Sequence, residues 1–313
     1  MPALKLTTGA PLCALGSALL CLVSAAASGQ VGERPSADTF KDQTEVSSIL
    51  VPVTVKDSRG RLVATLDEKK FHLLVDGIEF PITSFWREGG LPLSVALVVD
   101  TSGSMGGRRL RRAREAILDF LRQRGPGDEV CLITFGAGEV KRRLKFGTDP
   151  DLLPRVLESL KGYGTTALYD VLTASRQVME GAKNIRRVIL LFTDGVDTAS
   201  KMTPDDAVRV LEGLDDPLYA FGIEPPPADQ GPPDSYEQLL QRFSAASGGR
   251  YIRVDDAANL PAFCRELRRE LTMRYIIAFQ PGGIGTSKYR KLEVRVDGAY
   301  QVLARQGYRG TLP

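Results

Sequence analysis

The middle of the chain alternates short apolar runs with segments whose apolar residues recur at helical spacing, and this alternation restricts the fold most. Apolar runs lie at 93–99, 130–135, 188–192, 218–223 and 251–254. Helical patterns lie at 110–121, 150–160, 167–179, 204–214, 235–246 and 260–271. A continuous apolar run is typical of a strand that is covered on both faces. The alternation therefore predicts an α/β fold with a doubly wound, mostly parallel sheet and helices on both faces. Glu139–Leu144 alternates in polarity and fits an antiparallel edge strand.

Both flanks of this region show the period-two alternation of strands instead. Strand patterns separated by turns occur at 49–55, 62–66, 71–75, 79–85, 274–279, 291–296 and 301–305. Neither flank is large enough to bury a good sheet alone, so we expect the two flanks to pair into one small discontinuous β domain. We place the N-terminal β segment at 46–90, the α/β domain at 91–272 and the C-terminal β segment at 273–313.

The first 27 residues predict a secretory signal peptide. Lys5 precedes an apolar stretch from Leu12 to Val23, and small residues follow at the two positions that a signal peptidase reads. We expect cleavage after Ala27, a flexible polar leader at 28–45, and an exported protein that is periplasmic, cell-surface or extracellular. An uncleaved anchor is the alternative, but the apolar run is shorter than the roughly 20 residues that span a bilayer. We expect no transmembrane segment after cleavage.

Charge, cysteine and histidine content exclude several kinds of site. The chain has 41 Lys and Arg residues and 38 Asp and Glu residues, and the loss of Lys5 leaves 40 basic residues. This near balance gives no electrostatic reason to expect a nucleic-acid partner. Cys131 and Cys264 remain after cleavage, and we expect buried thiols, with a disulfide as the alternative in an oxidising compartment. The single histidine, His72, excludes any site that needs two imidazoles; its strand pattern predicts a structural role.

Polar side chains follow two of the predicted strands at the point where each strand ends. The candidate ligands are two carboxylates and three hydroxyls: Asp100, Ser102, Ser104, Thr166 and Asp194. Ligands of an open parallel sheet bind outside the carboxyl ends of its strands, so the three loops that carry these residues are expected to open at one edge. An all-oxygen set suits a hard cation, magnesium first, with manganese or calcium as alternatives. Helix capping is the alternative role for the turn that begins at Asp100.

This set of residues resembles the metal-ion-dependent adhesion site (MIDAS) of von Willebrand factor type A (VWFA) domains. The resemblance covers about 91–271 in element order and fills every position of the motif. It implies a Rossmann-like VWFA fold and magnesium held by the two serines and the threonine, with the aspartates often acting through water. It also implies a partner's acidic side chain that completes the metal shell. Thr166 is chosen over Thr165 because 166–170 is similar to the family's loop-to-helix step. The flanking β segments further resemble those of secreted bacterial VWFA-related proteins.

Two features close to the candidate ligands in the sequence are not expected to bind the metal. The arginine-rich run at 108–114 is expected to form the solvated face of the first helix, with weak attraction for acidic partners near the metal. Asp197 is expected to be a turn residue or to lie outside the metal ligands.

The function that we expect is an exported, adhesion-type binding module that captures a protein partner's carboxylate through the metal, and not an enzyme. A magnesium-dependent hydrolase or phosphatase, with Asp100 as nucleophile, is the first alternative. Two observations argue against it. Aspartyl phosphatases of the haloacid dehalogenase type have a second aspartate at the position that Ser102 occupies here. The sequence also offers no general base near Asp100, because His72 lies outside this sheet. A metal-stabilised scaffold of a cell-envelope assembly is the second alternative, which the sequence does not separate from the binding module.

Overall fold

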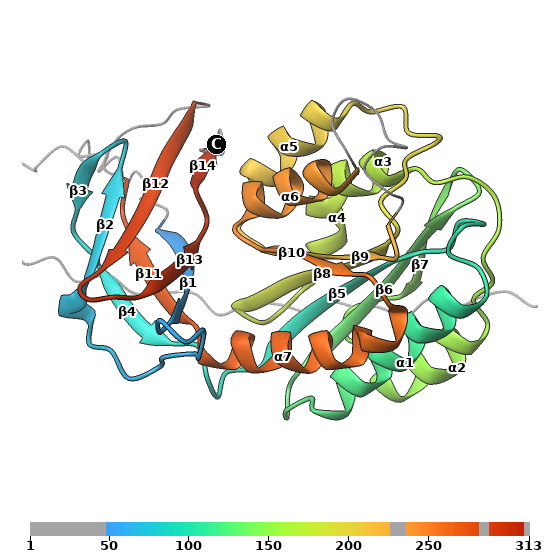
Figure 1. Cartoon of the computed structure of the whole chain (residues 1–313), viewed down its shortest axis with the longest axis horizontal. Coiled ribbons are helices and arrows are strands. Elements are labelled where there is room, and N and C mark those ends of the chain that lie inside the picture. Colours follow the sequence, from blue (N-terminus) through green and yellow to red (C-terminus); the bar gives the residue numbers. More distant parts are fainter. Residues whose placement is uncertain (1–47, 226–235, 282–287, 310–313) are drawn as a thin grey trace, which may run out of the picture. The chain divides into compact units, whose positions relative to one another are not determined.

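A computed structural model describes residues 48–225, 236–281 and 288–309 of the chain (Figure 1). The predicted signal peptide at 1–27 and leader at 28–45 lie outside these residues. All of the described residues belong to one compact unit. Within the described ranges, no helix combines the length and the apolar character that a bilayer crossing requires.

A six-stranded sheet forms the centre of the described chain. Its strands are β5 (Leu93–Asp100), β6 (Glu129–Gly136), β7 (Glu139–Leu144), β8 (Arg186–Thr193), β9 (Leu218–Ile223) and β10 (Tyr251–Val254). They are ordered β10-β9-β8-β5-β6-β7. Every neighbouring pair is parallel except β6 and β7, which are antiparallel. The predicted α/β fold class is confirmed, and so is the antiparallel edge strand.

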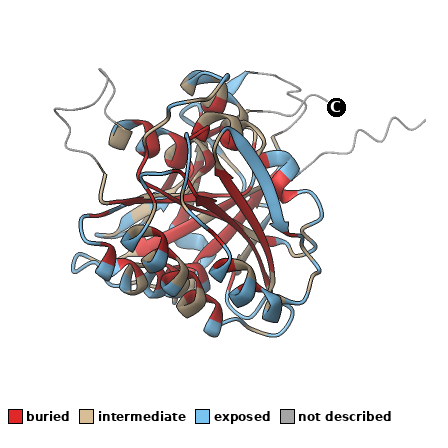
Figure 2. Cartoon of the chain, turned by 90° about the vertical axis from the view of Figure 1, so that its right-hand side faces the viewer, coloured by how far each residue is buried: buried red, intermediate tan, exposed pale blue. Residues whose placement is uncertain are grey.

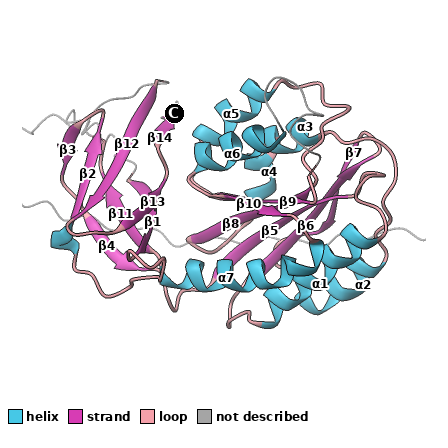
Figure 3. Ribbon diagram, in the orientation of Figure 1, coloured by secondary structure: helices cyan, strands magenta, loops and turns pink. Residues whose placement is uncertain are grey.

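Helices cover both faces of this sheet (Figure 3). One layer consists of α1 (Arg108–Arg122), α2 (Leu153–Glu158) and α7 (Leu260–Met273). The other consists of α3 (Leu168–Thr173), α4 (Ser175–Met179), α5 (Pro204–Glu212) and α6 (Tyr236–Ser247). The helix predicted at 167–179 is interrupted at Ala174. Beside the break, the Thr173 hydroxyl donates to the Asp170 carbonyl at 2.8 Å, a side-chain bond of the kind that competes with the helical backbone pattern.

The burial of β5 explains why its sequence lacks the alternation of the flanking strands. All eight residues of β5 are buried. Successive side chains of a strand point to opposite faces, so Leu97 joins the core under α1 and α7 whereas Ala96 joins the core under α3 to α6. Figure 2 shows the same pattern, with buried central strands and exposed outer helix surfaces. Cys131 and Cys264 are buried free thiols in these two different cores, as the sequence predicted.

The two flanks form two four-stranded sheets, ordered β13-β1-β11-β4 and β14-β12-β2-β3. The N-terminal flank supplies β1 (Ile49–Lys56), β2 (Phe71–Val75), β3 (Ile78–Phe80) and β4 (Ser84–Arg87). The C-terminal flank supplies β11 (Tyr275–Phe279), β12 (Tyr289–Val296), β13 (Gln301–Ala304) and β14 (Gly307–Arg309). Each sheet thus mixes strands from both flanks, which confirms the predicted pairing. The two sheets share one core, in which Val53 and Tyr275 of one sheet belong to the same cluster as Leu73 and Leu292 of the other.

A buried ion cluster connects these sheets to the central one. Glu88, just after β4, is 1% exposed, and its carboxylate accepts hydrogen bonds from Arg274 Nε at 2.6 Å and Arg274 Nη2 at 2.8 Å. Arg274 lies between α7 and β11, and its Nη1 donates to the Tyr219 hydroxyl of β9 at 3.2 Å. Arg186, the first residue of β8, places its Nε 3.2 Å from Glu88 Oε1. One carboxylate therefore balances two buried guanidinium groups at the junction.

The Glu88→Gln substitution tests this role. It leaves two buried guanidinium groups without their carboxylate, so we expect the free energy of unfolding to fall by about 3–5 kcal/mol, measured by urea denaturation. Glu266→Gln is the matched control, because Glu266 is 57% exposed and its Oε1 lies 3.9 Å from Lys56 Nζ; the control should lose at most about 1 kcal/mol. Equal losses in the two variants would contradict the account.

Candidate metal site

Asp100 is the last residue of β5 and forms the buried side of the candidate site. Its side chain is fully buried. Oδ1 accepts a hydrogen bond from the Ser102 backbone N–H at 2.8 Å, and Oδ2 accepts one from the Thr193 hydroxyl at 2.7 Å. Burial raises the pKa of Asp100 to about 6, although these hydrogen bonds oppose the change. A cation next to a buried carboxylate stabilises its charged form, so this carboxylate suits a metal.

The turn after Asp100 carries two serine hydroxyls, of which only Ser104 belongs to an exposed residue. Ser102 is buried and Ser104 is exposed, and their Oγ atoms lie 3.1 Å apart. The Gly103 N–H between them donates to the Gly164 carbonyl at 3.0 Å, which ties the turn to the neighbouring glycine-rich loop. The turn is therefore held in place by its backbone, with the Ser102 side of the hydroxyl pair buried and the Ser104 side accessible to solvent.

Asp194 follows β8 and brings the second carboxylate to the same edge. It is 1% exposed, and its Oδ2 lies 3.5 Å from Arg109 Nη1. The same Arg109 nitrogen donates to the Ser104 carbonyl at 2.9 Å, so Asp194 lies beside the serine turn. After burial, the charge of Asp194 is a further cause of the raised pKa of Asp100. The structure thus brings Asp100, Ser102, Ser104 and Asp194 together.

Thr166 lies on the adjoining loop and is buried. Its N–H donates to the Thr198 hydroxyl at 2.9 Å, and its carbonyl accepts from the Thr198 and Ala199 N–H groups. The same loop contacts the serine turn, where the Tyr163 N–H donates to the Thr101 carbonyl at 2.9 Å. These contacts involve the backbone of Thr166, so a ligand role for its hydroxyl stays a prediction.

The donors at this edge fit a hard divalent cation. Across the described residues, no three His, Cys, Asp or Glu side chains gather where they could hold a metal. A metal here would therefore depend on two carboxylates, Asp100 and Asp194, together with hydroxyl oxygens. Oxygen ligands of this kind suit magnesium, calcium or manganese, whereas zinc and copper favour imidazole or thiolate.

Two residues near the site escaped the sequence analysis or were given another role. Thr193 holds Asp100 in place, because its hydroxyl donates to Oδ2 and accepts from the Gly195 N–H at 3.0 Å. Its position at the buried end of β8, directly before Asp194, was the available signal. The expected solvated arginine face is wrong for Arg109, which is 27% exposed and bonded within the site. At the start of α1 its side chain reaches back to acceptors at the sheet edge.

Asp197 has the turn role that the sequence suggested. Its Oδ1 accepts hydrogen bonds from the Leu168 N–H at 2.8 Å and the Ser200 hydroxyl at 2.6 Å. Leu168 is the first residue of α3. Asp197 therefore satisfies a free N–H at the start of that helix, as capping carboxylates do.

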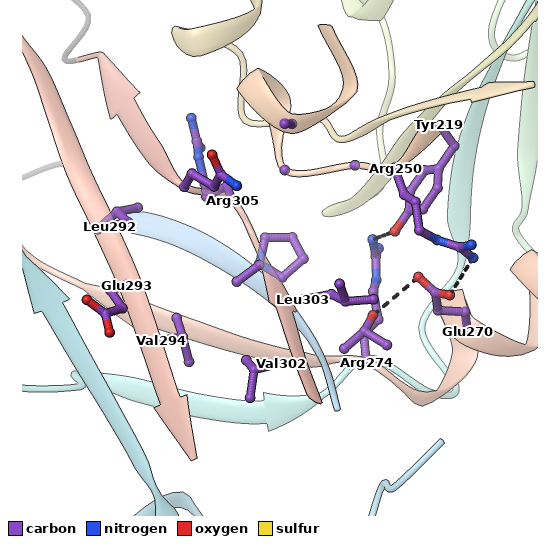
Figure 4. Close-up of a pocket in the computed structure, with 17 residues that line it drawn as sticks. Tyr219, Arg250, Glu270, Arg274, Leu292, Glu293, Val294, Val302, Leu303 and Arg305 are labelled. Carbon is purple, nitrogen blue, oxygen red and sulfur yellow. Dashed lines mark hydrogen bonds and ion pairs between the residues drawn. The ribbon is translucent and has the colours of Figure 1, made fainter. Parts of the chain in front are cut away.

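A cavity of about 280 Å³ lies elsewhere, where α7 meets the flanking strands (Figure 4). On its wall, the Glu270 carboxylate accepts hydrogen bonds from Arg250 at 2.9 Å and from the Thr54 hydroxyl at 3.5 Å. Arg274 is paired with Glu88 and donates to the Tyr219 hydroxyl. Because these charged groups pair with one another, we assign the cavity no ligand.

One protein family, two curated proteins and one solved structure are similar to this chain. Residues 95–196 match the family model of the von Willebrand factor type A domain. The chain is similar to inter-alpha-trypsin inhibitor heavy chain H4 of Sus scrofa, with 28% identity over 213 residues, 61% of this chain and 21% of the relative. The human H4 chain is 28% identical over 238 residues, 68% of this chain and 24% of the relative. The chain therefore spans less than a quarter of these relatives. A von Willebrand factor type A structure from Catenulispora acidiphila has a TM-score of 0.49 and 16% identity, with 74% of each chain covered.

Thr193→Val tests how Asp100 is held. The substitution keeps the shape of the side chain but removes a donor from a buried carboxylate, so we expect the free energy of unfolding to fall by about 1–3 kcal/mol. Urea denaturation in the presence of a chelator measures this without metal. Thr193→Ser retains the hydroxyl and should stay close to the wild type. A valine variant as stable as the wild type would show that the hydrogen bond is dispensable.

Proposed function

We propose that the chain is a metal-dependent protein-binding module of the adhesion type, since residues 95–196 match the family model of the von Willebrand factor type A domain. Asp100, Ser102, Ser104 and Asp194, with Thr166 as the fifth ligand, would hold a divalent cation, magnesium first. The observation that carries the proposal is the meeting of two buried carboxylates with a serine pair that reaches solvent at Ser104. The proposed exported location rests on the signal-peptide pattern of residues 1–27.

The donor set supports binding of a partner's carboxylate. When bound, the ion supplies an electrophilic centre, and two carboxylates balance a divalent charge without further strong donors. Such an ion retains affinity for an acidic side chain from another molecule. Tyr163, on the loop that contacts the serine turn, is 54% exposed and offers apolar surface next to the site. An acidic side chain within a protein surface is therefore the partner that we propose.

The hydrogen bonds of Asp100 and the position of His72 favour binding of a partner over hydrolysis of a substrate. Both carboxylate oxygens of Asp100 accept hydrogen bonds and the side chain is fully buried, so Asp100 is poorly placed to attack a substrate. His72 lies in β2 of a flanking sheet, where its Nδ1 is 2.9 Å from Glu79 Oε1 and its Nε2 is 3.3 Å from Asp297 Oδ1. These two carboxylates raise its pKa, although desolvation opposes the change. We therefore propose an interaction module rather than a phosphatase.

Asp100→Asn tests the metal. In the wild type, magnesium at 100 times its Kd should stabilise the folded state by about 2.7 kcal/mol, which a thermal melt with and without chelator detects. Asp100→Asn should fold but lose this response, because the amide keeps the shape and not the charge. Asp216→Asn is the matched control: Asp216 is also buried, burial raises its pKa to about 6, and its charged neighbours are Asp215 and arginines outside the site. A magnesium response in Asp100→Asn equal to that of the wild type would overturn the site.

A displayed random-peptide library tests the partner chemistry. Peptides bound to the immobilised full chain in magnesium and eluted by chelator should be enriched in Asp or Glu, since the ion selects carboxylates. The Asp100→Asn protein should yield no such enrichment, whereas Asp216→Asn should. Peptides that stay bound in chelator, or that lack acidic residues, would contradict carboxylate capture.

A further inference from the structure

Arg109 places a fixed positive charge at the edge of the candidate site. It lies in the first turn of α1, and its Nη1 is 2.9 Å from the Ser104 carbonyl and 3.5 Å from Asp194 Oδ2. Ser104 and Asp194 are both proposed ligands of the metal. The guanidinium therefore already interacts with the carboxylate that a metal would need.

Glu224 anchors Arg109 from the opposite side. The Glu224 carbonyl accepts from Arg109 Nη2 at 2.9 Å, and Glu224 Oε2 accepts from Arg109 Nε at 3.2 Å. Glu224 directly follows β9 and is itself held by Arg108 Nη2 at 2.6 Å and by the Ala257 N–H at 3.2 Å. Its φ of 46° lies in the left-handed region, which non-glycine residues seldom adopt. This backbone conformation orients the carbonyl that Arg109 uses. Arg109 is thus positioned by several contacts that do not involve the proposed ligands.

A metal bound at this site would compete with Arg109 for the charge of Asp194. The guanidinium neutralises part of this charge when the metal is absent, and a divalent cation at the same carboxylate would be repelled by the neighbouring positive charge. The side chain of Arg109 is 27% exposed, so solvent screens this repulsion only in part. Metal entry would consequently weaken the Arg109–Asp194 contact.

We propose that Arg109 is an internal counter-ion of the metal site, which balances Asp194 in the metal-free protein and lowers the affinity of the site for divalent cations. This inference rests on the proposed function, because it concerns the same site. Arg109 keeps its bonds to Glu224 when the contact with Asp194 weakens, so it stays at the edge of the site and continues to limit the affinity.

The experiment compares magnesium affinity in the full chain by isothermal titration calorimetry. Arg109→Gln removes the charge, and we expect magnesium to bind roughly tenfold more tightly, the size of effect that follows from one neighbouring like charge in a partly exposed site. Arg109→Lys keeps the charge and should stay within about threefold of the wild type. Arg112→Gln is the matched control, because Arg112 is 40% exposed on α1 and pairs with Glu115; its affinity should equal that of the wild type. Thermal melts in chelator verify that each variant folds.

The outcomes separate this inference from the proposed function. If the wild type binds magnesium and Arg109→Gln binds it no more tightly, the counter-ion role is overturned while the metal site stands. An equal gain in Arg109→Lys would also overturn it, since the effect would then come from the shape of arginine and not from its charge. If neither the wild type nor Arg109→Gln binds magnesium, the metal site and the counter-ion role fail together. Magnesium binding by Arg109→Gln alone would support the counter-ion role.

Discussion

The parallel pairing of β5 with β8 is the constraint on which the candidate site depends. Val99 pairs with Phe192 in this register, so Asp100 and the Thr193–Asp194 turn leave the sheet at the same edge. Helices on both faces bury the two strands, and burial in turn leaves the Asp100 carboxylate dependent on a few fixed donors. The hydrogen bond from Thr193 joins the two strand ends directly. The position of the Asp100 carboxylate therefore depends on both the pairing of β5 with β8 and the helices that cover them.

The flanking sheets are attached to this arrangement by charge as well as by apolar packing. Their shared core needs strands from both ends of the described chain. At the junction, Glu88 meets Arg274 and Arg186 in a buried cluster that is expensive to disrupt once one partner is lost. The central sheet and the flanking sheets thus depend on each other, although the proposed ligands all lie in the α/β part.

The sequence predicted the features that repeat locally and missed those that join distant residues. Apolar runs and the Asp-x-Ser-x-Ser spacing were sufficient to predict the central strands and to bring Asp100, Ser102 and Asp194 to one edge. Two contacts had no local signal: Arg109 meets Glu224 across 115 positions, and Arg274 meets Glu88 across 186. Charged residues of this kind look solvated in a sequence, because the pattern of one helix or strand does not contain their partners. The expectation of one flanking β domain likewise did not specify two sheets, since pairing partners are not encoded in alternation.

The central claim is that this sheet edge binds a divalent cation, and manganese tests it most directly. Crystals of the full chain grown with Mn²⁺ should show one anomalous difference peak at this edge, about 2.1 Å from the hydroxyl oxygens of Ser102 and Ser104. The same peak should be absent from crystals of Asp100→Asn. A peak bound to other residues, or none beside Asp100 and Asp194 at saturating Mn²⁺, would contradict the account.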